Sequence, residues 1–143
     1  MRIKLLPCRD SDYAIDLIAE HMLPQLRRAG ARAWRREDVL GAWAQCQNFE
    51  IWHTGSRIGI MRLQCDEPGV AVLEDLHLES SQQRRGFGRA CITAACDWAR
   101  QQGCARLELA VVKDTPAEQF YLRLGFQVYG KDSAFLHLRY PLV

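Results

Sequence analysis

The feature that most constrains the fold is a change of hydrophobic period in the middle of the chain. Residues 70–78, VAVLEDLHL, are typical of a strand, and over residues 86–102 the apolar residues recur at helical spacing. Residues 105–112, ARLELAVV, are typical of a second strand. A strand, a helix and a strand in this order form a crossover, so we expect the two strands to lie parallel in one sheet.

The flanking segments complete the order of elements. Further strands are expected over residues 2–7, 48–54, 57–65, 126–129 and 134–141. Further helices are expected from Asp10 or Ser11 to about His21, over residues 36–47, and from the capping box Thr115–Glu118 to Gly125, with an irregular stretch between Pro24 and Gly30. The order β-α-α-β-β-β-α-β-α-β-β predicts a mixed α/β fold, a sheet flanked by helices, in one domain of residues 1–143.

Composition narrows the class of protein. No apolar run approaches the roughly 20 residues that span a bilayer, and the apolar part of MRIKLLPCRD is too short for a secretory signal. We therefore expect a cytoplasmic protein that does not bind membranes. The net charge of +2 gives no indication of nucleic-acid binding. The six cysteines contain no CxxC pair, so we interpret them as small buried residues and expect neither disulfides nor a metal.

The turn before the central helix has the composition of an anion site. It reads Gln83-Arg84-Arg85-Gly86-Phe87-Gly88-Arg89. Glycines let the backbone fold tightly, and the N–H groups and dipole of a helix N-terminus favour an anion such as a pyrophosphate. The turn lacks the GxGxxG and Walker A patterns of nucleotide sites. A purely steric glycine turn remains the alternative.

This stretch resembles the Gln/Arg-x-x-Gly-x-Gly/Ala signature of the GNAT superfamily of N-acetyltransferases. Leu78 stands five residues before Gln83, where that family has the last apolar residue of its central strand. The segment 114–121, DTPAEQFY, resembles the family's Asn-x-x-Ala-x-x-hydrophobic-Tyr helix, and Leu124-Gly125-Phe126 is similar to the sequence that ends it. The resemblance implies the GNAT fold and acetyl-CoA as the acyl donor.

The resemblance also implies roles for individual residues. The backbone of Leu76 and Leu78 would pair with the pantetheine arm, and the Leu78 N–H would stabilise the oxyanion. Gln83 would brace the turn, and Tyr121 would protonate the departing thiolate. Asp114 replaces the usual asparagine and can accept but not donate a hydrogen bond. The residues implied to contact acetyl-CoA are Leu76, His77, Leu78, Gln83, Arg84, Arg85, Gly86, Phe87, Gly88, Arg89, Asp114, Ala117, Phe120 and Tyr121.

The acceptor side is indicated by two carboxylates on the central strand. Glu74 would share strand parity with Leu76 and Leu78, and we expect it to be the base, directly or through a water. The Leu-Glu-Asp pattern of residues 73–75 is similar to that of diamine acetyltransferases. We expect Asp75 to contact the acceptor. Ion-paired or solvated carboxylates are the alternative.

Arginines concentrate between the first two expected helices, at positions 27, 28, 32, 35 and 36. We expect this segment to roof the acceptor site, with Arg28, Arg32 and Trp34 as contact residues. Such a roof would attract an anion or an acidic peptide, although solvated arginines and a Trp34 anchored in the core are the simpler interpretation. His77 could act as a base, but a structural histidine is the stronger expectation.

The leading hypothesis is an enzyme that transfers an acetyl group from acetyl-CoA to a primary amine by direct attack. The alternatives are a protein or peptide amine as acceptor, a catalytically silent acyl-CoA sensor, and a nucleic-acid-binding protein that uses the arginines. Members of the family are often dimers, so a homodimer is a further expectation.

Overall fold

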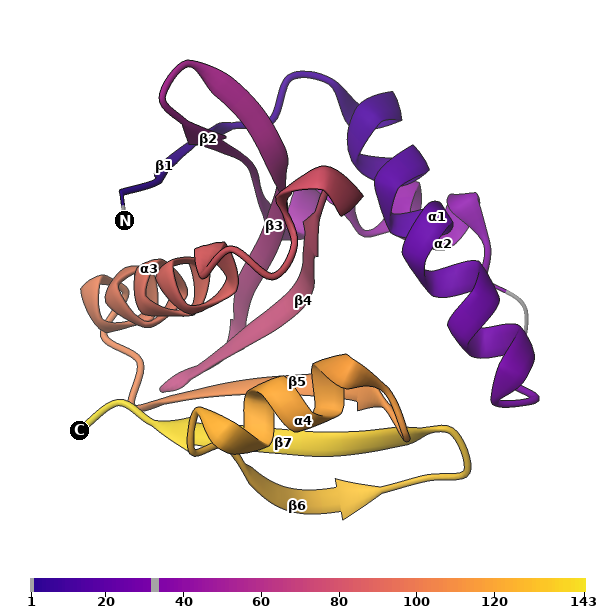
Figure 1. The fold of residues 1–143 in the computed structure, drawn as a ribbon. Coiled ribbons are helices and arrows are strands. Elements are labelled where there is room, and N and C mark those ends of the chain that lie inside the picture. Colours follow the sequence, from indigo (N-terminus) through magenta and orange to yellow (C-terminus); the bar gives the residue numbers. More distant parts are fainter. Residues whose placement is uncertain (1, 32–33) are drawn as a thin grey trace.

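The computed structural model describes residues 2–31 and 34–143 and forms one mixed sheet with helices on both faces (Figure 1). Within these residues the strands lie in the order β1-β2-β3-β4-β5-β7-β6. The strands are β1 (Lys4–Pro7), β2 (Gln47–His53), β3 (Ser56–Glu67), β4 (Val70–Leu78), β5 (Arg106–Val112), β6 (Gln127–Lys131) and β7 (Phe135–Pro141). The helices are α1 (Ser11–Arg28), α2 (Arg36–Gly41), α3 (Phe87–Gln101) and α4 (Pro116–Arg123), with short 3-10 turns η1 (Trp43–Gln45) and η2 (Ser80–Gln82). The predicted fold class and element order are confirmed.

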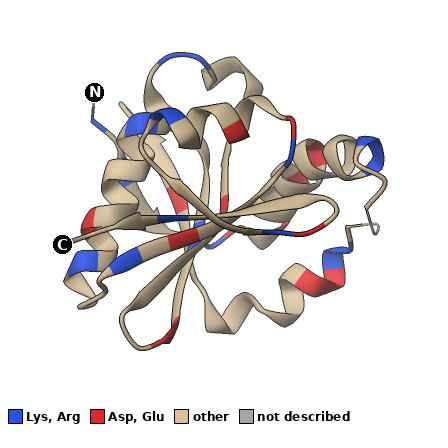
Figure 2. Cartoon of the chain, turned by 90° about the horizontal axis from the view of Figure 1, so that it is seen from below, with Lys and Arg blue, Asp and Glu red and all other residues tan. Residues whose placement is uncertain are grey.

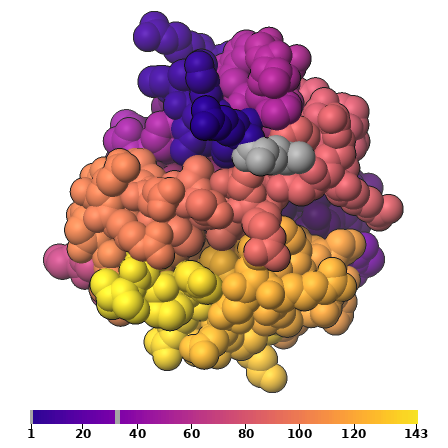
Figure 3. All heavy atoms as spheres, turned by 60° about the vertical axis from the view of Figure 1, so that its left-hand side comes forward, coloured from indigo at the N-terminus to yellow at the C-terminus, as the bar shows by residue number. Residues whose placement is uncertain are grey.

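Each face of the sheet has its own core. On one face, Phe87, Cys91 and Ala95 of α3 and Tyr121 of α4 pack against the strands. Figure 3 shows α3 and the C-terminal elements in contact along this side of the molecule. On the opposite face, a smaller cluster joins α1 and α2 to Ile60 of β3. The sheet thus separates an α3–α4 side from an α1–α2 side.

The crossover strands β4 and β5 pair only briefly. They are parallel, as predicted, and pair over Val70–Val72 with Arg106–Glu108. Beyond that point β4 stays paired with β3 and β5 with β7, but β4 and β5 diverge (Figure 1). The rest of β4 therefore has one edge without a neighbouring strand among the described residues.

Two helix predictions were wrong in extent. Helix α1 does not end near His21 but continues through Pro24 to Arg28, so the expected irregular stretch is helical. A proline inside a helix removes one hydrogen bond, and burial of Leu26 beyond it stabilises the added turn. Helix α2 ends at Gly41 rather than residue 47.

The structure shows why α2 is short. The side-chain amide of Asn48 donates to the carbonyl oxygens of Trp43 and Cys46. These carbonyls are satisfied from β2, and the chain enters the strand at Gln47.

The cysteine interpretation holds for most of the six thiols, all of which are free. Cys46, Cys91, Cys96 and Cys104 are buried and Cys8 is half-buried. Cys65 is exposed, so the expectation of burial was wrong there, because the end of β3 projects beyond the core.

Candidate active site

The glycine turn before α3 forms a cradle of backbone N–H groups. Arg84 and Gly86 have φ values of 61° and 86°, so the chain turns tightly before α3 begins at Phe87. The first N–H groups of a helix have no partner within it and, with the helix dipole, attract an anion. Gln83 donates from Nε2 to the carbonyl oxygen of Leu78 at 3.1 Å, which ties the turn to the end of β4.

Side chains around the turn fix it in place. Phe87 is fully buried, and the Arg85 guanidinium lies 5.3 Å from the centre of its ring. Arg85 also donates to Gln82 at 2.9 Å. The side chains of Arg84 and Arg89 are exposed beside the cradle, where they can approach a phosphate.

Gly88 has a packing role as well. A Cβ atom at this position would lie 3.0 Å from the ring of Phe120 on α4. The glycine therefore lets α3 and α4 approach closely beside the cradle.

The open edge of β4 presents backbone groups next to this turn. The N–H of Glu79 donates to the carbonyl of Ile58, on the β3 side, at 2.8 Å. Successive N–H groups of a strand point to opposite edges, so those of Leu78 and Leu76 point away from β3, toward the diverging β5. An extended ligand on this edge would meet them as a further strand would.

A bulge in β4 changes the predicted side-chain parity. Arg62 of β3 pairs with Asp75, and its neighbour Leu63 pairs with Leu73, so Glu74 is the extra residue. The prediction that Glu74 shares parity with Leu76 was wrong, because the bulge interrupts the alternation. Leu76 and Leu78 pack into the α3–α4 core, together with Leu73.

Glu74 is exposed and accepts a hydrogen bond from Gln64 of β3. Gln64 lies two residues from Arg62 on β3, so both side chains project from the face that α1 and α2 cover. The bulge thus places Glu74 and Asp75 on the α1–α2 side of the sheet.

Tyr121 lies on the other side, in α4. Its side chain is 8% exposed and packs against Phe120 and Phe126, with ring centroids 5.1 and 5.4 Å away. Burial raises the pKa of the Tyr121 phenol above its ordinary value, and the nearby Cys91 and Asp75 raise it further. The phenol is therefore protonated at neutral pH and can donate a proton.

The predicted capping box starts α4. Thr115 accepts from the N–H of Glu118 at 3.2 Å, and Glu118 accepts from the N–H of Asp114 at 3.1 Å. Asp114 has a positive φ of 59° and an exposed side chain. Ala117 is partly buried against the core, as is Phe120.

Asp75 belongs to a buried polar chain that the sequence did not reveal. The Arg62 guanidinium donates to Asp75 Oδ2 at 2.7 Å, and Asp75 Oδ1 lies 3.2 Å from Nε2 of His77. Nδ1 of His77 lies 3.1 Å from Nδ1 of His21 on α1. The His77 side chain therefore faces α1 rather than the open edge of β4. No motif could have indicated His21, which is 56 residues from His77.

A groove of about 370 Å³ opens between α1 and η2. Its polar lining includes the carboxylates of Asp16, Glu20 and Glu79. Tyr13 donates to Glu79 at 2.6 Å, and the Arg57 guanidinium stacks 3.5 Å from the centre of the Tyr13 ring. The α1 side of the molecule thus offers negative charge that the sequence analysis did not anticipate.

The described arginines of the expected roof are exposed or ion-paired, and their contact with an acceptor stays a prediction. Arg36 donates to Asp12 and Asp16 of α1, at 3.0 and 3.1 Å. Arg27 and Arg28 are exposed in the last turn of α1, where they complement the helix dipole. Figure 2 shows basic and acidic residues interspersed in this part of the chain.

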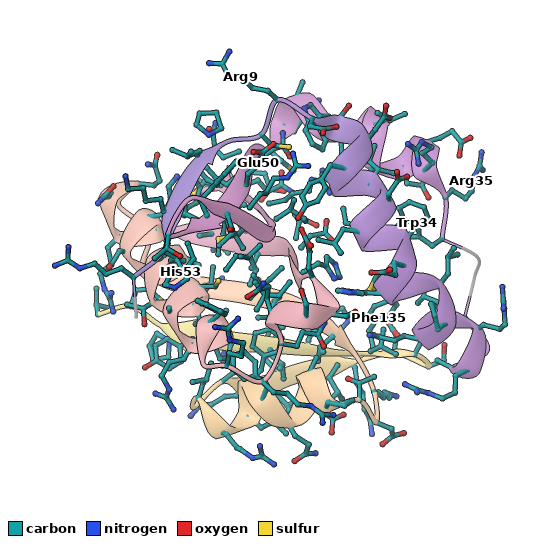
Figure 4. The ribbon with its side chains drawn as sticks, turned by 45° about the horizontal axis from the view of Figure 1, so that its top comes forward. Arg9, Trp34, Arg35, Glu50, His53 and Phe135 are labelled. Atoms are coloured by element: carbon teal, nitrogen blue, oxygen red, sulfur yellow. The ribbon has the colours of Figure 1, made fainter. Side chains whose placement is uncertain are left out.

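Trp34 packs against the α1–α2 cluster and lies beside α1 (Figure 4). This matches the simpler interpretation of Trp34 as an anchor. Arg32 lies outside the described residues.

Residues 2–31 and 34–143 contain neither a cluster of metal ligands nor a helix that could span a membrane. No group of three or more His, Cys, Asp or Glu side chains there is arranged to hold a metal ion. No helix in these ranges is both long and apolar enough to cross a membrane.

The splayed strand pair and the adjoining N–H cradle define an α/β protein that can hold a phosphate-bearing ligand at an open sheet edge. Comparison with known proteins identifies the class. The model of the Acetyltransferase (GNAT) family matches residues 15–126. The chain belongs to this family.

Individual relatives agree with this assignment. Streptothricin acetyltransferase of Streptomyces lavendulae is 36% identical over 63 residues, which are 43% of this chain and 33% of that enzyme. The PaiA N-acetyltransferase of Thermoplasma acidophilum, solved with coenzyme A, superposes with a TM-score of 0.77 and 17% identity over 99% of each chain. A GNAT acetyltransferase of Elizabethkingia anophelis with bound acetyl-CoA gives a TM-score of 0.76 and 11% identity over 98% of this chain and 97% of the other. These structural matches support the fold.

Proposed function

We propose that this protein transfers the acetyl group of acetyl-CoA to an amine, with the donor lying along the open edge of β4. The observation that carries the proposal is the continuity of this edge with the α3 cradle. Gln83 ties the two together through Leu78, so one extended molecule can pair with the strand and place a pyrophosphate on the helix N-terminus. The open edge of β4 suits the pantetheine arm of the donor, and the N-terminus of α3 suits its pyrophosphate.

The acetyl group would lie at Leu78. In this proposal the Leu78 N–H, which points away from β3, stabilises the oxyanion of the attacked thioester. The Leu76 backbone pairs with the pantetheine arm, and amides of residues 84–89 hold the pyrophosphate. Arg84, Arg85 and Arg89 add positive charge, and Asp114, Ala117 and Phe120 border the donor from the α4 side.

Proton transfer would use both faces of the sheet. An amine is protonated at neutral pH and must lose a proton before it attacks. We assign this step to Glu74, directly or through a water, because it is exposed on the α1–α2 side. Tyr121, on the opposite side and protonated at neutral pH, donates to the departing thiolate. Asp75 lies beside Glu74 and orients the acceptor.

The acceptor is proposed to be a cationic amine. The groove beside α1 is lined by Asp16, Glu20 and Glu79. Arg36 pairs with Asp16, so Glu20 and Glu79 supply the negative charge of the groove. Negative charge raises the local concentration of cations. The similarity to streptothricin acetyltransferase adds a specific amine to test.

The test is release of free CoA from acetyl-CoA in the presence of one amine at a time. The panel contains streptothricin, spermidine, a lysine-rich peptide and, as the charge-reversed control, a peptide with an acidic N-terminal sequence. We expect turnover with a cationic member. Tight CoA binding without turnover of any amine would contradict the proposal, and preference for the acidic peptide would contradict the assigned acceptor class.

A further inference from the structure

The reaction proposed above must dispose of a proton. A protonated amine and acetyl-CoA yield an acetamide, the free thiol of CoA and one proton. One hydrogen of the ammonium stays on nitrogen, one ends on sulfur and the third must reach solvent. An acceptor bound over Glu74 covers that carboxylate, so the third proton needs another exit.

A series of side chains leads from Asp75 to Glu20, at the solvent-exposed rim of the groove beside α1. Its three contacts are Asp75 Oδ1 to His77 Nε2 at 3.2 Å, His77 Nδ1 to His21 Nδ1 at 3.1 Å, and His21 Nε2 to Glu20 Oε2 at 3.5 Å. The side chains of Asp75, His77 and His21 are 14%, 10% and 14% exposed, whereas that of Glu20 is 63% exposed. This series of side chains is therefore largely shielded from solvent except at Glu20.

The series from Asp75 to Glu20 has one hydrogen fewer than its three contacts need. Two neutral imidazoles carry two N–H hydrogens, but three contacts need one each. Nε2 of His21 is buried and makes no hydrogen bond; Glu20, at 3.5 Å, lies within ion-pair distance only. If the hydrogens point toward Asp75, this nitrogen carries a lone pair. If they point toward Glu20, Nε2 of His77 faces Asp75 as a lone pair. One added proton completes all three contacts.

The surroundings of His21 favour its neutral form. Burial lowers the pKa of His21 below its ordinary value, His77 lowers it further, and Glu20 partly offsets this. The Arg62 guanidinium, on Asp75 Oδ2, compensates the Asp75 charge. The other titratable groups near this chain are Cys46 before β2, Glu74 of β4 and Tyr121 of α4.

We propose that Asp75, His77, His21 and Glu20 form a proton relay that carries the proton of the acceptor amine to solvent. A proton that reaches Asp75, from the amine or from Glu74, passes to Nε2 of His77. The Nδ1 hydrogen of His77 passes to His21, and the Nε2 hydrogen of His21 passes to Glu20 and then to water. Because His21 does not touch the reactants, it acts as a positioning and relay residue.

The test is His21→Asn, assayed with acetyl-CoA and the cationic amine that the wild-type protein acetylates best. Asparagine keeps a polar partner for His77 but cannot pass a proton. We expect kcat at neutral pH to fall about 100-fold, the lower end of the range for a lost acid–base step, with KM for acetyl-CoA unchanged. The loss should shrink as pH rises, because the amine then arrives deprotonated. Added imidazole should restore part of the rate.

The matched control is His137→Asn, which removes a histidine of β7 that lies 3.3 Å from Asp132, next to the edge strand β6. It should leave kcat and its pH profile unchanged. A folded His21→Asn protein with normal kcat at neutral pH would overturn the relay, as would a deficit that neither pH nor imidazole relieves. If His21→Asn does not fold, Glu20→Gln at the exposed end decides in the same assay, read as kcat at saturating amine because Glu20 also lines the acceptor groove. A wild-type protein without turnover contradicts the proposed function instead.

Discussion

The two halves of β4 belong to one strand and have opposite environments. Over Val70–Val72 the strand pairs with β3 on one edge and β5 on the other, and Val70 and Ala71 are buried. From Leu73 to Leu78 only the β3 edge is paired. This open half begins with a bulge and carries Glu74, Asp75 and His77. The closed half holds the sheet together, and the open half presents backbone groups and ionisable side chains.

The two halves of β4 differ in what satisfies their backbone N–H groups. A backbone N–H that loses its partner and is buried costs free energy, so the open edge is stable only while water or a ligand satisfies it. The closed half has no such requirement. Changes in the open half should therefore alter ligand binding and turnover, and changes in the closed half should alter stability.

The largest effect on CoA binding is expected from a change in the glycine turn, which follows the open half of β4. Gly86→Val places a β-branched residue at a φ of 86°, which distorts the turn. Loss of two charge-assisted hydrogen bonds of about 1.5 kcal/mol each would weaken CoA binding about 100-fold. Isothermal titration calorimetry with CoA measures this affinity.

Gly103→Val is the matched control for this variant. Gly103 follows the other end of α3 with a φ of 80°, and nothing lies within 4 Å of a Cβ atom there. Both variants should lose about 1–3 kcal/mol of stability from backbone strain, but only Gly86→Val should lose CoA affinity. Equal affinities in the two variants would show that the turn does not hold the pyrophosphate.

An effect of similar size, on turnover instead of binding, is expected from Tyr121→Phe, which leaves the ring in place against Phe126. Loss of the proton donor should lower kcat about 100-fold, the lower end of the range for a lost acid–base step, while CoA affinity stays unchanged. Tyr129→Phe is the control: the Tyr129 hydroxyl donates to Glu108 at 3.1 Å on the β6 side of the sheet, and its loss should leave kcat unchanged. Steady-state kinetics separates the two, and a normal kcat in Tyr121→Phe would remove this tyrosine from the mechanism.

The features that the sequence predicted are those with local causes. The change of period at the Gln83 turn predicted the crossover, and the capping box at Thr115 predicted the start of α4. The spacing from Leu78 to Gln83 placed the end of β4 beside the cradle, and the bond between these two residues agrees with it. Each depends on a few residues adjacent in the chain, so the sequence pattern contains the physical cause.

The features that the sequence missed depend on distant partners. The bulge at Glu74 arises from the register of β3 against β4, which no pattern within β4 reports. His21 and Arg62 became relevant only when α1 and β3 packed around Asp75. The ion pairs of Arg36 were not predicted because Asp12 and Asp16, which neutralise it, lie 24 and 20 residues away in the sequence. Strand register and ion pairing are tertiary properties.

The smallest effect on activity is expected from a crosslink in the closed half. The Sγ atoms of Cys65, at the end of β3, and Cys104, just before β5, lie 3.2 Å apart. An added disulfide reagent such as oxidised glutathione can join them while it is itself reduced. Closing this loop should stabilise the protein by about 2–4 kcal/mol. Because the crosslink lies beyond the paired end of β4 and β5, kcat and KM should not change.

The pH dependence of this oxidation can be predicted as well. Residue Cys65 is exposed overall, but its thiol is partly desolvated, which raises its pKa to about 12, and the hydrogen bond with Cys104 contributes. The thiolate is the reactive form, so crosslinking should be slow at neutral pH and accelerate about tenfold for each pH unit below that pKa. Mass spectrometry reports the crosslink and Cys65→Ser prevents it. If the crosslinked protein loses turnover and the Cys65→Ser protein treated in the same way does not, the two halves of β4 are mechanically coupled. The closed half would then control how far the open edge can separate from β5.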